Sequence, residues 1–94
     1  MYDLLVLPPA MDEIEEASDW YSEQSDRLAR EFNDQVLFQL ERIRQHPRLY
    51  PERFDDLRVS LMKRFPFKIL FEVDDAARLI VILSLSHHKR NKPY

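Results

Sequence analysis

LRVSLMKRFPFKILFEVDDAARLIVILSLSHHKRNKPY, residues 57–94, is the stretch of sequence that decides the fold. Apolar and polar residues alternate along 57–61 and again along 67–73, which is the period of a β-strand with one buried face. Residues 79–83 form a continuous apolar run, which indicates a central strand buried on both faces. The polar positions are mostly cationic, so we expect a small sheet with a cationic rim. Such a surface suits phosphate or an acidic protein partner rather than the interior of a metabolic active site.

The residues before this stretch predict one strand and two helices. Residues 2–7 favour a short strand, which Pro8 and Pro9 end. Two amphipathic helices follow, and Ser25 or Asp26 is the expected N-cap of the second one. Residues 46–56 contain two prolines and are expected to form a loop. The apolar stripes are Ala10, Ile14, Ala17 and Tyr21 in the first helix, and Ala29, Phe32, Val36, Leu40 and Ile43 in the second.

These elements predict a single α+β domain over residues 1–94, in the order β-α-α-β-β-β. An N-terminal strand precedes an antiparallel helical hairpin, and a three-stranded antiparallel stretch completes one small sheet. The apolar sides of the three C-terminal strands are expected to pack against the helices. Arg58 and Lys68 are then expected to project from the opposite, partly open face. The expected core consists of Phe32, Val36, Leu40, Phe67, Ile69, Phe71, Ile80 and Ile82.

The composition excludes several kinds of site. The chain has no cysteine, which excludes disulfides and thiolate metal sites. It has no glycine, which the phosphate-binding loops of nucleotide-binding proteins require for close backbone approach. His87 and His88 are adjacent, so on a strand they point to opposite faces and do not form a ligand pair. We therefore expect neither a cofactor nor a metal.

Charge and hydropathy indicate the cellular location of the protein and the kind of partner it binds. Residues 1–41 carry a net charge of −9 and residues 42–94 a net charge of +6. This division suits an anionic target, or else opposite charges that meet across the fold. No apolar run approaches the ~20 residues that span a bilayer, and the N-terminus lacks the basic segment of a signal peptide. We expect a cytoplasmic protein with no membrane partner.

Several short motifs, taken in order, carry information beyond the fold. They are Trp20-Tyr21 in an acidic helix; Pro47 with Tyr50-Pro51; Arg58, Leu61, Arg64-Phe65-Pro66-Phe67, Ile69, Phe71 and Val73; residues 80–85; and His87-His88-Lys89-Arg90 with Pro93-Tyr94. In this order and spacing, over nearly the whole chain, the sequence resembles the RelE/ParE superfamily of toxins from bacterial type II toxin–antitoxin systems. It most resembles the ParE-like branch, often labelled plasmid stabilisation proteins.

The resemblance implies a function that differs by branch. ParE-like toxins inhibit DNA gyrase by binding, whereas RelE-like toxins cut mRNA in the ribosomal A site. The long helical hairpin resembles the ParE side, so the expectation is a growth-arresting gyrase inhibitor that a cognate antitoxin neutralises in a hetero-oligomer. Two alternatives stay open: a ribosome-dependent mRNA endoribonuclease, and a non-toxic orphan that serves only as an interaction module.

The candidate site residues depend on which hypothesis holds. RNA cleavage needs a proton-transferring group and cations for the phosphate charge. The residues for it would be Arg58, Arg64, His87, His88 and Tyr94, with Lys68 as a further cation. Binding of a target or antitoxin would use cations expected on a single face, namely Arg58, Arg64, Lys68, Lys89 and Arg90. The plain alternative is that Arg58 pairs with a neighbouring acid and that the C-terminal cations are an ordinary solvated tail.

Overall fold

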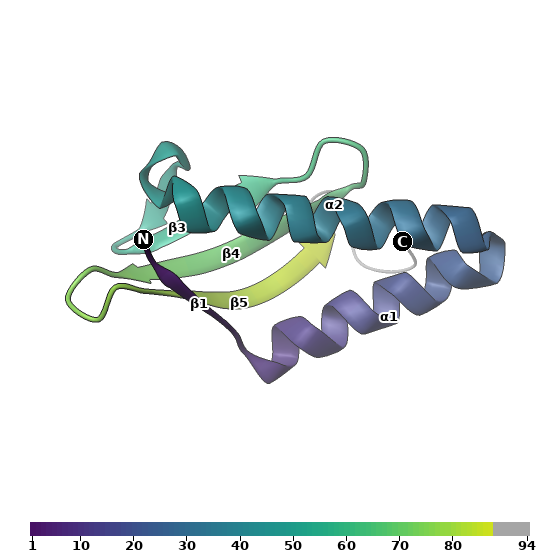
Figure 1. The fold of residues 1–94 in the computed structure, drawn as a ribbon, viewed down its shortest axis with the longest axis horizontal. Helices are drawn as coiled ribbons and strands as arrows, with labels where there is room; N and C mark the ends of the chain where they lie inside the picture. The colour runs from purple at the N-terminus through teal and green to yellow at the C-terminus, as the bar shows by residue number, and fades with distance from the viewer. Residues whose placement is uncertain (88–94) are drawn as a thin grey trace.

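A helical hairpin packs on one face of a five-stranded sheet in the computed structural model (Figure 1), which describes residues 1–87 apart from the side chain of Phe54. This confirms the α+β class and the hairpin. The chain has one strand more than expected, since residues 46–56 contain a short strand as well as a helical turn. The elements are β1 (Asp3–Val6), α1 (Pro8–Gln24), α2 (Asp26–Gln45), the 3-10 turn η1 (Pro47–Leu49), β2 (Glu52–Phe54), β3 (Leu57–Leu61), β4 (Phe67–Asp74) and β5 (Leu79–His87).

The strands lie in the order β1-β5-β4-β3-β2. β1 runs parallel to β5, with Asp3 beside Leu79, and the other neighbours are antiparallel. β5 therefore has a strand on each side, as its apolar run predicts. The prediction that this run is buried on both faces is wrong, because Ile80 and Ile82 are buried while Val81 is only half-buried. The physical reason is that helices cover one face of the sheet.

The sequence predicts a break over residues 22–26, but the two helices are joined by the single residue Ser25. α1 begins with Pro8 and Pro9, which lack the N–H groups that the first turn of a helix leaves unpaired. Ser25 is the N-cap of α2, as predicted, because its hydroxyl oxygen accepts a hydrogen bond of 3.2 Å from the Leu28 backbone N–H. This bond satisfies one of the donors exposed at the start of α2.

The hydrophobic core lies between the hairpin and the sheet. Four aromatic rings meet edge to face at its centre, with ring centroids 5.1 Å apart for Tyr21 and Phe65 and 5.6 Å apart for Phe32 and Phe67. This is the favoured geometry for aromatic pairs. The predicted core is confirmed, with Leu40 half-buried at its margin; the buried members are Phe32, Val36, Phe67, Ile69, Phe71, Ile80 and Ile82.

β3 faces the opposite way from the prediction. Its polar residues Arg58 and Ser60 pair beside the core residues Phe71 and Ile69, so they lie on the side of the helices. The reason is visible in α2, where Gln39 falls within the buried stripe and donates a hydrogen bond of 2.7 Å to the Ser60 hydroxyl. A buried amide needs such a partner. The apolar residues of β3 are consequently left on the far face of the sheet.

Candidate functional site

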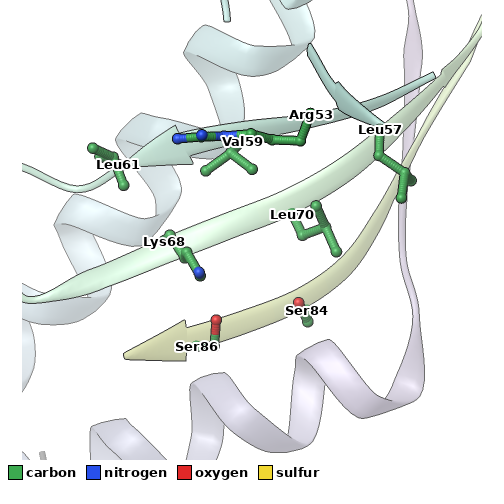
Figure 2. A pocket seen from close by; sticks show the side chains of 8 residues that line it. All are labelled: Arg53, Leu57, Val59, Leu61, Lys68, Leu70, Ser84 and Ser86. Atoms are coloured by element: carbon green, nitrogen blue, oxygen red, sulfur yellow. The ribbon is translucent and has the colours of Figure 1, made fainter. Parts of the chain in front are cut away.

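A groove of about 630 Å³ runs along the face of the sheet that the helices leave open. Figure 2 shows its side chains standing on β2, β3, β4 and β5, with α2 behind the strands. The strand register sets them in rows: Val59 lies beside Leu70 and Ser84, and Leu61 lies beside Lys68 and Ser86. The lining residues are Arg53, Leu57, Val59, Leu61, Lys68, Leu70, Ser84 and Ser86.

A β-bulge in β5 gives this face its polar side. Leu70 pairs with Ser84 while the next residue, Phe71, pairs with Ile82, so Leu83 is an extra residue. A bulge of one residue reverses which side chains face which side of the sheet. Beyond the bulge, Leu85 therefore joins the core, and the two serines of β5 line the groove.

The groove combines an apolar floor with cations that form no ion pair with the described residues. Its floor is aliphatic, and Leu61 keeps 56% of its surface exposed. Arg53 and Lys68 are the charged residues among the lining side chains, and within residues 1–87 neither forms an ion pair. Exposed apolar surface beside unpaired positive charge is complementary to an amphipathic segment that carries acidic residues.

Arg58, predicted to share a face with Lys68, lies on the other side of the sheet. Its side chain is only 11% exposed. The guanidinium donates a hydrogen bond of 2.7 Å to the Tyr50 carbonyl oxygen, and its other terminal nitrogen lies 3.4 Å from a carboxylate oxygen of Glu52. The prediction of a single cationic face is therefore wrong for Arg58, which is held by its neighbours on the helix side.

Arg64 lies in the loop between β3 and β4 and holds that loop against α2. It donates a hydrogen bond of 2.9 Å to the Glu31 carboxylate, and its guanidinium carbon lies 5.4 Å from the centre of the Phe65 ring. The hydrogen bond from Arg64 is the main reason that the pKa of Glu31 is lowered, and Arg27 adds to the effect. Arg64 is thus already engaged in an ion pair.

His87, at the end of β5, also lies on the helix side. It pairs opposite Phe67, and the two rings meet edge to face with centroids 5.7 Å apart. Arg58, Arg64, Lys68 and His87 therefore do not converge on one point. The other predicted site residues, His88, Lys89, Arg90 and Tyr94, lie outside the described residues.

Most of the groove was not among the residues predicted as a site. Lys68 was predicted, but Arg53, the two serines and the aliphatic floor were missed. One signal in the sequence points to them: Gln39 lies three residues after Val36 and four before Ile43, so it must face the core. A buried glutamine requires a polar partner, and this turns the polar side of β3 toward the helices.

Within residues 1–87, histidine and acidic side chains do not gather in a group of three or more that could hold a metal ion. Over the same residues, neither helix combines the length and the hydrophobicity that crossing a bilayer requires.

The sequence matches the family described as ParE toxin of type II toxin–antitoxin system, parDE, over residues 4–92. The chain belongs to the ParE toxin family. Among curated protein sequences, none matches the chain. The match to the ParE family covers the described elements from β1, apart from its first residue Asp3, to β5, and so includes both the hairpin and the groove.

Solved structures share the fold of this ParE-family chain. The chromosomal ParDE system of P. aeruginosa is similar with a TM-score of 0.79 and 20% identity, covering 93% of this chain and 96% of that chain. The isolated E. coli RelE toxin is similar with a TM-score of 0.69 and 15% identity, covering 98% of this chain and 89% of that chain. A chain of the intact E. coli RelBE toxin–antitoxin complex is similar with a TM-score of 0.69 and 15% identity, covering 96% of this chain and 100% of that chain. The fold is thus common to ParE and RelE toxins.

Proposed function

We propose that this ParE-family chain arrests bacterial growth by binding and inhibiting DNA gyrase, and that an antitoxin neutralises it. The observation that supports a binding mode is the dispersal of the residues that RNA cleavage would need. Strand cleavage by a 2′-hydroxyl requires a base, an acid and phosphate-binding cations within hydrogen-bond reach of one phosphate. Here Arg58 is partly buried on one face, Lys68 stands on the other, and Arg64 is paired with Glu31.

The antitoxin of this proposal binds the open face of the sheet. An acidic amphipathic segment covers the aliphatic floor of the groove with its apolar side and meets Arg53 and Lys68 with its carboxylates. A segment that folds as it binds suits such a surface, because it can cover a long groove. The solved ParDE and RelBE systems, in which a toxin of this fold is named together with its antitoxin, support an antitoxin as the partner.

The proposed target is tested by inducing the chain alone in a bacterial host. Gyrase supercoiling is measured in the arrested cells, and mRNA ends are mapped in the same cells. We expect loss of supercoiling without codon-positioned mRNA cuts. Cuts at codon positions with intact supercoiling would establish the endoribonuclease instead, and unimpaired growth would establish a non-toxic interaction module.

A His87→Ala, His88→Ala double variant separates the two chemistries further. A binder that does not move protons should still arrest growth, provided that the variant folds and binds antitoxin. Removal of a general acid or base would slow cleavage by ~10²–10⁴-fold. A folded, antitoxin-binding double variant that is harmless, beside a wild type that generates mRNA cuts, would overturn the gyrase proposal.

The antitoxin site is tested by Lys68→Glu, with Lys63→Glu as the matched control, because Lys63 is exposed in the loop between β3 and β4 and does not line the groove. We expect Lys68→Glu to weaken antitoxin binding and Lys63→Glu to change it little. Binding of the wild type should also weaken as salt rises, since exposed charge contacts are screened over ~10 Å at 0.1 M ionic strength. Equal losses for both variants would remove the groove from the proposal.

A further inference from the structure

The outward side of α2 exposes two neighbouring large apolar side chains. Leu37 is 66% exposed and Phe38 is 55% exposed. Neither belongs to the core, which uses the opposite side of the helix, and neither lines the groove. α2 covers one face of the sheet and the groove lies on the other (Figures 1 and 2), so this surface is separate from the proposed antitoxin site.

Opposite charges flank Phe38 one helical turn away on either side. Asp34 precedes it by four residues and Arg42 follows it by four, and both are exposed. The Arg42 guanidinium carbon lies 5.9 Å from the centre of the Phe38 ring. Within residues 1–87 neither Asp34 nor Arg42 forms an ion pair, whereas Glu31 and Glu41 of the same helix do.

We propose that the outward side of α2 binds a second copy of this chain, with the two helices antiparallel and a two-fold axis passing beside Phe38. A symmetric interface of this kind requires a surface that is complementary to itself. In this arrangement the two Phe38 rings meet, and each Asp34 faces Arg42 of the partner subunit. Both charges, which form no ion pair within residues 1–87 of one chain, then acquire one.

The charges also decide the alignment of the two helices. If the axis passed between Leu37 and Phe38, Asp34 would face Glu41 of the partner subunit, and like charges would repel. Residues 34, 38 and 42 form one row at a spacing of four, and packing such rows against each other is the commonest contact between helices in globular proteins. The patch is small, so the dimer is weak and forms with rising protein concentration.

Sedimentation of the purified full-length chain over a range of concentrations tests the dimer. We expect a reversible monomer–dimer equilibrium. Asp34→Arg alone and Arg42→Asp alone should each raise the dissociation constant at least tenfold, because like charges then face each other. The double variant Asp34→Arg, Arg42→Asp should return it to near the wild-type value. Both positions are exposed, and circular dichroism checks that each variant is folded.

Cysteine cross-linking tests the position of the axis, because the natural chain has no cysteine. We expect Phe38→Cys to form a disulfide-linked dimer on mild oxidation. Leu49→Cys, at a position 71% exposed but outside α2, is the control and should stay monomeric. A wild type that stays monomeric at all concentrations overturns the proposal and leaves this surface to a different protein. A dimer whose dissociation constant is unchanged by either charge reversal also overturns the proposal. So does a dimer that cross-links no better through Phe38→Cys than through the Leu49→Cys control.

Discussion

At the scale of single residues, the hydrogen bond between Gln39 and Ser60 determines how α2 sits on β3. Gln39 is 5% exposed and Ser60 is fully buried. The Gln39 amide donates to the Ser60 hydroxyl at 2.7 Å and approaches the Leu61 carbonyl oxygen at 3.4 Å. In a core of aliphatic and aromatic side chains, each of these polar groups depends on the other.

The losses of stability from removing each member of this pair should therefore not add up when both are removed. We expect Ser60→Ala to lower the free energy of unfolding by about 1–3 kcal/mol, because the Gln39 amide loses its best acceptor while remaining buried. The double variant Gln39→Leu, Ser60→Ala should be closer to the wild type than the sum of the single changes. Urea unfolding of the four proteins measures this, and strict additivity would show that the two side chains do not interact.

The ion pair between Glu31 and Arg64 makes part of the stability depend on pH. Because its pKa is lowered in the folded protein, Glu31 stabilises the fold at pH values above its unfolded pKa. This stabilisation is lost as the pH falls through the lowered pKa. We expect Arg64→Gln to be less stable than the wild type near neutral pH, and the difference to vanish in acid.

Carboxylate titration by NMR and unfolding at several pH values measure the effect of this ion pair. The pKa of Glu31 should rise in Arg64→Gln. Arg30→Gln is the control, since Arg30 forms no ion pair within residues 1–87 and its loss should leave the pKa of Glu31 where it was. A stability difference that persists unchanged at low pH would mean that Arg64 acts through its packing on Phe65 rather than through charge.

At the scale of elements, hydrophobic period predicted both helices, β3 and β4, and short apolar runs predicted β1 and β5. The period predicted the wrong face for β3, where the apolar residues form the groove and Ser60 is buried with Gln39. It also missed β2, which has only three residues, follows Pro51 and carries two charges. The bulge at Leu83 could not be predicted, since it depends on pairing with β4. The candidate site was predicted only at Lys68 for the same reasons.

The one-residue link between the helices makes Ser25 a sensitive position. Its hydroxyl caps α2, and it is the single residue between the two helices. We expect Ser25→Ala to lower the free energy of unfolding by about 1 kcal/mol. Ser22→Ala, in the last turns of α1 and exposed, should leave stability unchanged or slightly higher, because alanine favours helix. Equal effects of the two changes in denaturant unfolding would contradict the role of the cap.

At the scale of the whole molecule, stability rests on the contact between the hairpin and the middle of the sheet. Phe71 is fully buried there, with the Tyr50 ring edge-on at 5.8 Å. We expect Phe71→Ala to lower the free energy of unfolding by about 3–5 kcal/mol, because it leaves a cavity. Phe38→Ala, measured at low protein concentration, should change it by less than about 0.5 kcal/mol. An unchanged melting temperature for Phe71→Ala would show that this ring does not support the core.

The parallel pairing of β1 with β5 has a consequence for how the protein is made. Residues 3–6 leave the ribosome well before their partners, residues 79–82, so β1 waits without a partner while all the elements between them are synthesised. The helical hairpin, which needs only local sequence to form, can precede it. The sheet closes only when β5 has emerged. A nascent chain that stops short of residue 79 therefore lacks both an inner strand of the sheet and the two serines that line the groove.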